Sequence, residues 1–410
     1  MIRDKYLNIN KLIKNKKLMR LFLVVAHHGG VLRFVGGAVR DALKGIEGSD
    51  IDFATDLSPD ELVEACTEEG IKTVGIGIKY GTVGVIIDDT MVEVTSLRRD
   101  IKTDGRHAIV EFTDNWEEDA SRRDLTINAV YADEKGNVFD YYNGIEDLEK
   151  GIVRFIGKAD QRIKEDYLRI LRFFRFYSMF GNGSPDKKAL KACTENREEL
   201  KKLPMERIRD ELLKLLLTPR AVETIKIMQE NNILSFVMPD AHHWQELEYL
   251  KKLFNGKVLE SKPLLYLFTL YQPNLSLAEN MATRLKFSKK ERQKFVSWAE
   301  IPVSWQDILD EKTRLHLAYE YGKDFCLEKL LLIAAQNQQD IPNFWDIYSQ
   351  IEQMFVPEFP LKGKHLIEQG VEPAQIGAIL KIRELAWIES DFSLSQEELI
   401  RPFLSKVSGE

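Results

Sequence analysis

The pattern of apolar residues changes once along this chain, near residue 155, and the change limits the folds that the chain can adopt. Before it, short apolar runs typical of strands alternate with amphipathic helical segments. After it, apolar residues recur at helical spacing with very few strand signals. We therefore predict an α+β protein, with a small α/β head built on a mixed sheet, followed by an all-helical neck, body and tail.

The predicted segments follow the breaks in this pattern. Strands are expected at 31–35, 50–54, 83–87 and 91–97, with a hairpin turn between the last two. Helices are expected at 21–26, 36–45 and 58–70, the last with Ser58 as its N-cap and Glu61 three residues later. The predicted head spans residues 1–154, the neck 155–217, the body 218–300 and the tail 301–410.

Cysteine usage and the lengths of the apolar runs indicate where the chain works. Cys66, Cys193 and Cys326 lie far apart without a CxxC pair, as expected in a reducing cytoplasm, and the seven histidines form no zinc motif. The apolar run at 21–26 is shorter than a signal peptide requires. The run at 263–271 is shorter than the roughly 20 residues that cross a bilayer. We expect a cytoplasmic protein without a membrane partner.

The segment VGGAVRDALKG, residues 35–45, joins a strand to a helix through two glycines. Free backbone N–H groups at a helix N-terminus bind phosphate, and glycine lets the ligand approach closely. Gly37 lies in this turn and Arg40 lies on the first turn of the helix. Both are therefore candidates for binding a phosphate group.

Two aspartates follow on the next predicted strand. Asp50 and Asp52 are two residues apart, so on a strand they project from one face while Ile51 and Phe53 point into the core. Two carboxylates this close repel each other unless a cation lies between them. Oxygen ligands suit Mg²⁺, which also binds triphosphate oxygens, and two such ions assist attack by a hydroxyl and departure of pyrophosphate. After the glycine turn, this pair predicts nucleotidyl transfer from a nucleoside triphosphate.

Two further segments of the head carry polar residues that suit such a site. Glu93 lies on a predicted neighbouring strand, either as a third carboxylate at the metals or as a residue behind them. The segment RRDLTINAV, residues 122–130, places two arginines and an aspartate at a helix entry, where they could hold a triphosphate or a ribose. Such a cluster is by itself more often a surface salt bridge.

The stretch EDYLRILRFFRF, residues 165–176, is mostly apolar but carries Asp166, Arg169, Arg172 and Arg175 at spacings of three. On a helix these four residues form one slowly rotating polar stripe. Cytosine and adenine present an amino donor beside a ring-nitrogen acceptor, whereas uracil and guanine present a carbonyl beside an N–H. An ionised carboxylate accepts and a guanidinium donates, so an Asp and an Arg one turn apart complement C and A. The alternative is an ion-pair network on an exposed helix.

The order of these motifs resembles the class II tRNA nucleotidyltransferases, the CCA-adding enzymes, and in particular their compact bacterial type. Residues 35–55 resemble the family's metal and triphosphate motif, 122–129 its ribose motif and 140–157 its hinge. Residues 165–176 resemble its amino-acid template, and 206–216 the helix that supports the template. The resemblance is dense over the first ~220 residues and weaker to residue 381.

The resemblance implies a role for each matching residue. It places Asp50 and Asp52 on Mg²⁺, with two ions expected, and Gly37 and Arg40 on the triphosphate, with Arg123 on the nucleotide. It makes Asp166 and Arg169 the readers of the base, supported by Arg172 and Arg175. The implied substrates are CTP, ATP and the 3′ end of tRNA. One departure is Tyr167, where the family commonly has proline; no polar group is lost by it.

Other functions within and outside the family stay open. Bacterial poly(A) polymerases share this head but usually follow the metal motif with an arginine-rich strand, whereas this chain has VGIGIKYGTVGVII at 74–87. Enzymes that add only CC lack a flexible loop, and residues 98–119 supply a polar connection containing glycine. An A-adding enzyme, a poly(A) polymerase and a catalytically idle tRNA-binding relative are the alternatives to complete CCA addition. The oligomeric state is not indicated.

RNA binding has to overcome a formal net charge of −7. The sharpest positive cluster is RLKFSKKERQKF at 284–295, with six basic residues and one acid. Contacts from such a cluster to phosphates need no sequence readout. The predicted tRNA-binding residues are Arg284, Lys286, Lys289, Lys290, Arg292 and Lys294. Taken alone, each basic run is more often a solvated helix face.

Overall fold

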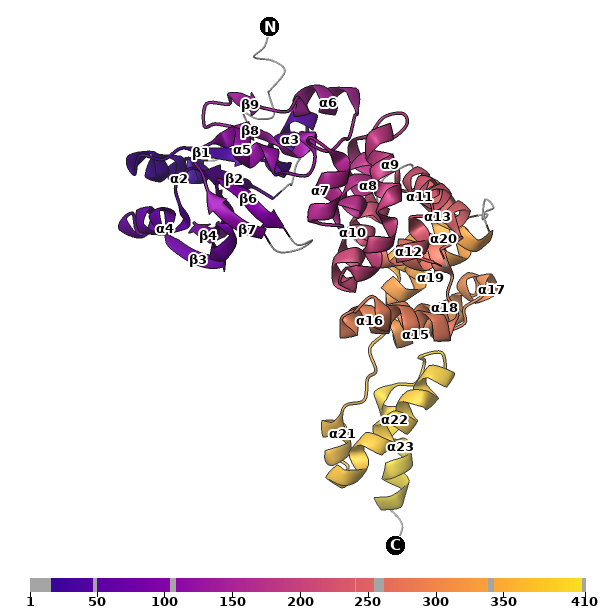
Figure 1. The fold of residues 1–410 in the computed structure, drawn as a ribbon. Coiled ribbons are helices and arrows are strands. Elements are labelled where there is room, and N and C mark those ends of the chain that lie inside the picture. The colour runs from indigo at the N-terminus through magenta and orange to yellow at the C-terminus, as the bar shows by residue number, and fades with distance from the viewer. Residues whose placement is uncertain are drawn as a thin grey trace. The chain divides into compact units, whose positions relative to one another are not determined.

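The computed structural model describes residues 16–46, 50–103, 108–239, 241–253, 262–337 and 343–407 (Figure 1). The chain divides into two compact units. The first contains Met1–Trp244 with Val258–Pro263, and the second contains Gln245–Lys257 with Leu264–Glu410. In the described residues, no helix is both long and apolar enough to cross a membrane.

The head contains a seven-stranded mixed sheet with the order β3-β4-β5-β2-β1-β8-β9. β2 and β5 run parallel, and the other neighbouring strands run antiparallel. The strands are β1 (Leu32–Val35), β2 (Asp52–Thr55), β3 (Lys72–Gly77), β4 (Thr82–Ile87), β5 (Thr90–Ser96), β8 (Val130–Ala132) and β9 (Val138–Asp140). The predicted mixed sheet is confirmed, and the strands predicted at 31–35, 83–87 and 91–97 agree to within a residue at each end.

Helices cover the sheet and close its core. They are α2 (Lys16–His27), α3 (Gly37–Lys44), α4 (Pro59–Glu68), α5 (Trp116–Ser121) and α6 (Gly144–Lys150), with short 3₁₀ turns η2 (Ile78–Tyr80) and η3 (Thr126–Asn128). Phe22 of α2 packs against Phe34 of β1 and Phe53 of β2, with ring centroids 5.2 and 5.7 Å away. The predicted capping box of α4 is present, since Ser58 and Glu61 exchange side-chain-to-backbone hydrogen bonds.

One expectation for the head was wrong in detail. β2 begins at Asp52, so Asp50 lies in the loop before the strand and not on it. The connection at 98–119 contains a hairpin that was not predicted, in which β6 (Arg98–Thr103) and β7 (Ala108–Phe112) pair before α5. Arg99 and Glu111 face each other across this hairpin with an N–O distance of 2.7 Å. Its tip, residues 104–107, lies outside the described residues.

The rest of the first unit is helical, as predicted. It contains α7 (Ala159–Glu165), α8 (Arg169–Phe180), α9 (Lys187–Glu195), η4 (Arg197–Lys202), α10 (Met205–Leu217), α11 (Ala221–Glu230) and α12 (Leu234–Val237). α8 packs against α10 and α11 (Figure 1). Its apolar side is closed, with Leu171, Phe173 and Phe174 at most 1% exposed.

The polar stripe predicted at 166–175 does not lie on one helix. Asp166 is extended, with φ −156° and ψ 109°, and α8 begins at Arg169. The Asp166 carboxylate accepts a hydrogen bond from the Leu168 N–H at 3.1 Å, and its carbonyl accepts one from the Arg169 N–H at 3.0 Å. Asp side chains that bond the following backbone in this way favour a turn before a helix over the helix interior. Asp166 therefore stands just ahead of α8, and the three arginines lie on it.

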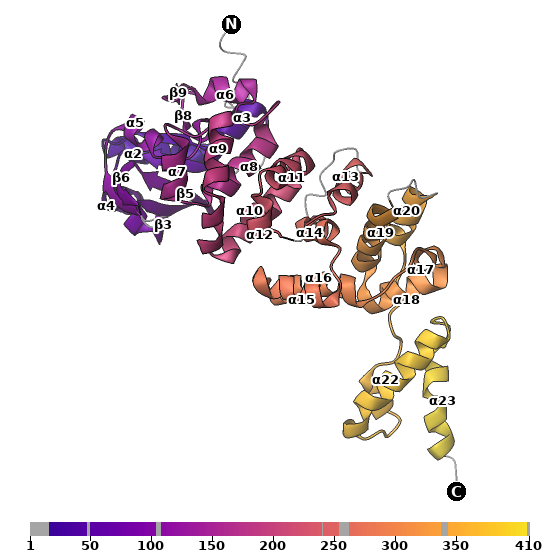
Figure 2. The ribbon, with the colours of Figure 1, turned by 45° about the vertical axis from the view of Figure 1, so that its right-hand side comes forward.

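The second unit is helical throughout its described residues. Its helices are α13 (Trp244–Leu253), α14 (Pro263–Tyr271), α15 (Leu275–Arg284), α16 (Lys289–Glu300), α17 (Trp305–Leu309), α18 (Glu311–Tyr321), α19 (Lys323–Asn337), α20 (Phe344–Gln353), α21 (Gly363–Ile367), α22 (Pro373–Glu389) and α23 (Gln396–Val407). α15 and α16 lie side by side in both views (Figures 1 and 2). α21, α22 and α23 share a small core around Leu366, Trp387 and Leu399.

Candidate active site

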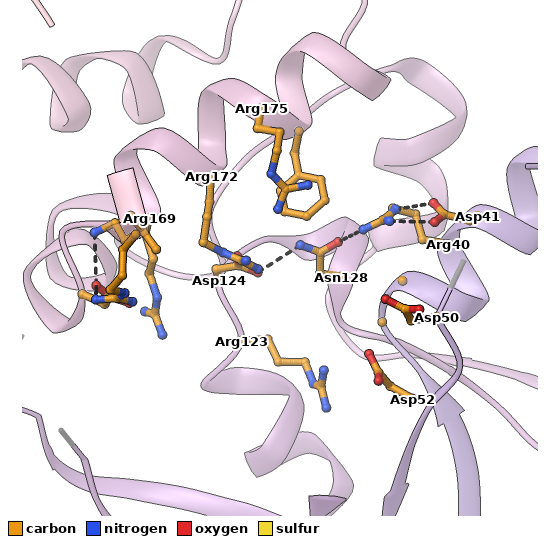
Figure 3. A pocket seen from close by; sticks show the side chains of 16 residues that line it. Arg40, Asp41, Asp50, Asp52, Arg123, Asp124, Asn128, Arg169, Arg172 and Arg175 are labelled. Carbon is orange, nitrogen blue, oxygen red and sulfur yellow. Dashed lines mark hydrogen bonds and ion pairs between the residues drawn. The ribbon is translucent and has the colours of Figure 1, made fainter. Parts of the chain in front are cut away.

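A polar cavity of about 690 Å³ opens in the first unit, where α3, the start of β2 and η3 face α8 and α10 (Figure 3). Except for Glu93, every residue predicted in the head and neck to bind metal or nucleotide lines it. These are Gly37, Arg40, Asp50, Asp52, Arg123, Asp166, Arg169, Arg172 and Arg175; Gly36, Asp41, Asp124, Asn128, Leu168, Phe176 and Arg207 complete the lining. Segments more than 150 residues apart in sequence thus form one site.

The glycine turn brings backbone close to the cavity. Gly36 has φ +64°, a conformation that L residues with a side chain rarely adopt, and α3 begins directly after it. A Cβ on Gly36 would lie 3.6 Å from an Nη1 of Arg123. The first backbone N–H groups of α3 have no partner within the helix. The turn can therefore present N–H donors to a phosphate beside Arg123.

The two aspartates face this turn without a compensating partner. Asp52 is half-buried, and Glu93 of β5 lies in register beside it, exposed and outside the cavity lining. Burial raises the pKa of Asp52, the charge of Glu93 raises it further, Arg123 lowers it, and Asp50 raises it. Neither Asp50 nor Asp52 forms an ion pair or hydrogen bond with another described side chain. Uncompensated carboxylates of this kind fit a cation.

The donor set for such a cation is small. The described residues hold no group of three His, Cys, Asp or Glu side chains arranged to bind one ion. Mg²⁺ commonly binds through one or two carboxylates and completes its six positions with water and phosphate oxygens. Asp50 and Asp52 fit this pattern if a triphosphate supplies the remaining ligands. The contribution of Glu93 stays a prediction.

Arg123 is held by a buried carboxylate that the sequence prediction missed. Asp119, 1% exposed, accepts from Arg123 Nη2 at 3.1 Å, from Arg122 Nη2 at 2.6 Å and from the Tyr131 hydroxyl at 2.8 Å. Burial alone would raise the pKa of Asp119, but Arg123 and Arg122 lower it to about 2. The charge of Asp119 is therefore present throughout the neutral range, and it fixes Arg123 toward the cavity.

The two predicted base readers are each held by a separate partner rather than by each other. Arg207 of α10 binds both carboxylate oxygens of Asp166, at 3.2 and 2.7 Å. Glu165 accepts from Arg169 Nη1 at 2.5 Å, and the Arg122 carbonyl accepts from Arg169 Nη2 at 3.2 Å. These pairs fix the direction in which each group faces the cavity.

The rest of the stripe is anchored in the same way. Asp124 accepts from Arg172 Nε at 2.7 Å, and Glu211 of α10 accepts from Arg175 Nε at 2.6 Å. Burial alone would raise the pKa of Asp124, but the charge of Arg172 and the hydrogen bonds from Asn128 and Arg172 lower it well below its usual range. The predicted support of the template by 206–216 thus has two contacts, through Arg207 and through Glu211.

The side chain of Arg40 is less mobile than we expect of an arginine that binds a triphosphate. It is 7% exposed, and Asp41 accepts from its Nε and Nη2 at 2.8 and 3.0 Å. Asn128 accepts from its Nη1 at 2.5 Å, and the guanidinium lies over the rings of Phe176 and Phe180. The arginine reaches the cavity wall mainly as a link between α3 and α8.

The sequence pointed to the arginines but did not predict which acid holds each of them. Asp119, Asp124 and Glu211 are buried, at 1%, 7% and 6% exposure. In a chain with many arginines, a buried acid indicates that it pairs with an arginine, but only the fold shows which arginine it is. Arg207 lay within the recognised 206–216 segment and gave no separate signal.

The basic run at 284–295 lies in the second unit, on the end of α15 and the start of α16. Arg284, Lys286, Lys289, Lys290 and Arg292 are exposed. Lys294 instead pairs with Glu328, which is 1% exposed, at 2.7 Å. tRNA binding by this cluster stays a prediction.

The head and cavity define a nucleotidyltransferase-type site. Residues 32–154 match the family described as "Poly A polymerase head domain", and residues 184–245 match "Probable RNA and SrmB- binding site of polymerase A". The fold is similar to a structure of the CCA-adding enzyme of Bacillus stearothermophilus in complex with CTP. That similarity has a TM-score of 0.73 and 24% identity, and covers 96% of this chain and 97% of that one.

Sequence similarity extends over nearly the whole chain. It is 33% identical to human mitochondrial CCA tRNA nucleotidyltransferase 1, covering 94% of this chain and 88% of that protein. It is 29% identical to the CCA-adding enzyme of Ligilactobacillus salivarius, covering 94% of this chain and 95% of that protein. The chain belongs to the class II CCA-adding tRNA nucleotidyltransferases. The predicted family is confirmed.

Proposed function

We propose that this chain adds C, C and A in turn to the 3′ end of tRNA, using CTP and ATP and no nucleic-acid template. The observation that carries this proposal is that one cavity holds two aspartates without an ion-pair or hydrogen-bond partner among the described side chains, together with a carboxylate and a guanidinium held in fixed directions. The first pair suits the transfer of a nucleotidyl group. The second suits recognition of the base.

The catalytic role is assigned to Asp50 and Asp52. Two Mg²⁺ ions bound there would make the RNA 3′-hydroxyl a better nucleophile and neutralise charge on the departing pyrophosphate. The N–H groups at the start of α3 and the guanidinium of Arg123 hold the phosphates, since both donate only. The 3′-oxygen attacks the α-phosphate, the bond to the β-phosphate oxygen breaks, and the hydroxyl proton leaves to solvent.

Base choice is assigned to Asp166 and Arg169. Their hydrogen bonds within the protein leave acceptor and donor positions that the base can use. A carboxylate offers about four acceptor positions; Arg207 takes two of those of Asp166, and the Leu168 N–H takes a third. One acceptor is left for the amino group of C or A. Arg169 makes three donor contacts, so of its five N–H groups about two are left for a ring nitrogen.

The reaction is tested with a tRNA transcript that ends at the base before CCA. The transcript is incubated with Mg²⁺ and CTP, ATP or both, and the 3′ ends are sequenced. Addition of two C residues and then one A, followed by a stop, supports the proposal. One A added only to a transcript ending in CC would make the chain an A-adding enzyme, and a long A tail would make it a poly(A) polymerase.

One variant distinguishes the proposed enzyme from a catalytically idle protein that only binds tRNA. Asp52→Asn should lower turnover by about 10²–10³-fold, as expected when a group that stabilises the transition state is lost, and tRNA binding should not change. Asp60→Asn, an exposed acid of α4 outside the cavity, is the control. Turnover of Asp52→Asn near that of the control would refute the metal assignment. The cytoplasmic location stays a prediction.

A further inference from the structure

One side chain in the cavity both accepts from a head arginine and donates to a carboxylate that holds the template helix. Asn128, in η3, is 6% exposed. Its Oδ1 accepts from Arg40 Nη1 at 2.5 Å, and its Nδ2 donates to Asp124 Oδ1 at 3.1 Å. An arginine can only donate and an ionised aspartate can only accept, so the two neighbours fix which way the amide faces.

The bonds continue without a break from α3 to α8. Asp41 holds Arg40 by two bonds, and Asp124 Oδ2 accepts from Arg172 Nε at 2.7 Å. Figure 3 shows the series Asp41, Arg40, Asn128, Asp124 running across the back of the cavity toward Arg172. Asp41 and Arg40 lie on α3, which directly follows the glycine turn, and Arg172 lies on α8, the helix that follows the predicted base reader Asp166.

A second contact closes the same connection. The Arg40 guanidinium lies 4.9 and 4.6 Å from the ring centroids of Phe176 and Phe180, which are both on α8. Arg40 is therefore bonded to Asn128 on one side and stacked on the template helix on the other. A shift of the amide would move Arg40 and Asp124 together, and would therefore change the contacts that hold α8 in place.

We propose that Asn128 is a positioning residue for base selection, which sets the distance and orientation of the template helix relative to the triphosphate site. The proposal rests on the proposed function of the cavity. Asn128 acts through Arg40 and Asp124, because its oxygen and nitrogen are both engaged by these protein groups. An amide is needed here, since one neighbour donates and the other accepts.

The test replaces the amide with a carboxylate of the same shape. Asn128→Asp still accepts from Arg40 but faces Asp124 with a like charge. The control is Asn196→Asp, because Asn196 is 8% exposed and donates to Asp160 at 2.9 Å in the same unit but outside the cavity. Both variants therefore gain a buried carboxylate beside an aspartate.

Three quantities are measured for each variant: the ratio of C to U incorporated at the first position, the KM for CTP, and the KM for tRNA. For Asn128→Asp we expect the C-to-U ratio to fall roughly tenfold and the KM for CTP to rise severalfold, as expected when a buried hydrogen bond is replaced by repulsion. The KM for tRNA and all values for Asn196→Asp should stay near wild type. A purely structural role would lower the unfolding temperature of both variants without changing the C-to-U ratio.

If Asn128→Asp does not fold, Asn128→Ser removes the bridge without adding charge and should show the same loss of base choice to a smaller extent. A wild-type C-to-U ratio in a folded Asn128 variant, or an equal change in Asn196→Asp, would overturn the proposal. The wild-type protein in the same assay reports separately on the proposed function. If it adds no C at all, that function fails, whatever the variants do.

Discussion

At the scale of single residues, the active site is organised by buried acids that each hold an arginine in one direction. Asp119 holds Arg123 and Asp124 holds Arg172, while Glu211 holds Arg175. A flexible arginine would lose side-chain freedom on binding a nucleotide, and an arginine already fixed loses less. We therefore predict that the acids contribute to nucleotide affinity without touching the nucleotide.

Asp119 gives a prediction on both stability and binding. Replacing a buried, paired carboxylate leaves its partners unpaired, so Asp119→Asn should lower the free energy of unfolding by about 3 kcal/mol at pH 7. It should also raise the KM for CTP, because Arg123 is no longer fixed. Urea unfolding and steady-state kinetics measure the two effects. Glu118→Gln, at a more exposed neighbouring acid, is the control.

The same variant tests how the stability of the protein depends on pH. Because the pKa of Asp119 in the folded chain is lowered from 3.8 to about 2, its stabilising charge is fully present above pH 3.8 and is lost as the pH falls toward 2. Wild-type stability should therefore fall more steeply in that window than the stability of Asp119→Asn. Parallel curves for the two proteins would contradict the role given to Asp119.

At the scale of secondary-structure elements, α10 contacts the proposed template through Arg207, which lines the cavity, and through Glu211. Arg207 binds both oxygens of Asp166, and Glu211 reaches Arg175, so α10 fixes both ends of the base-reading segment. The sequence of α10 shows this only as an amphipathic helix with charged residues. Its function depends on which face meets α8.

The effect of Arg207 on base choice can be distinguished from a general effect of substitutions in α10. Arg207→Ala should lower the preference for C over U roughly tenfold, because Asp166 then turns without its bidentate partner. Arg209→Ala on the same helix, where Arg209 pairs with exposed Asp210, should leave the preference unchanged. The measurement is incorporation from CTP and UTP in competition. Equal preferences in the two variants would mean that α10 does not orient the base reader.

Local sequence patterns predicted the elements that depend on local interactions. The strand, glycine turn and helix at 32–44 and the capping box at Ser58 follow from spacing alone, and both were found. Asp50 was predicted on a strand and Asp166 on a helix, but each lies in the loop just before that element. The spacing of apolar and polar residues locates an element more accurately than it locates the ends of that element.

Contacts between distant segments were beyond the reach of the sequence. β6 (RRDIKT) is mostly polar and β7 (AIVEF) is mostly apolar, and neither alternates regularly, so local pattern did not reveal that the two strands pair, with Arg99 facing Glu111. The relay through Asn128 joins residues 40, 128 and 172, which nothing in their local sequence links. The cavity residues could be predicted singly, but not the bonds that hold them.

At the scale of the whole molecule, chemistry and RNA holding are predicted to lie in different units. The cavity belongs to the first unit, and the exposed basic residues of α15 and α16 belong to the second. With a net charge of −7, attraction for RNA has to come from such local clusters. Phosphate contacts made there would serve every tRNA equally.

The basic cluster gives a prediction about affinity and salt. Lys289→Glu with Lys290→Glu should raise the Kd for tRNA roughly tenfold at low salt and flatten its dependence on salt concentration, because fewer counterions are released. Lys135→Glu, in a turn of the head, is the control. The kcat at saturating tRNA should not change. A defect limited to one tRNA species would contradict a role in backbone binding.

The central claim is that side chains, and not a nucleic-acid template, choose the base. It is tested most directly by kcat/KM for CTP, ATP, UTP and GTP with wild type, Asp166→Ala and the control Asp210→Ala, whose exposed carboxylate lies on α10 outside the cavity lining. We predict that Asp166→Ala loses preference for C and A over U and G while Asp210→Ala keeps it. An Asp166→Ala enzyme that is slower but equally selective would contradict the claim.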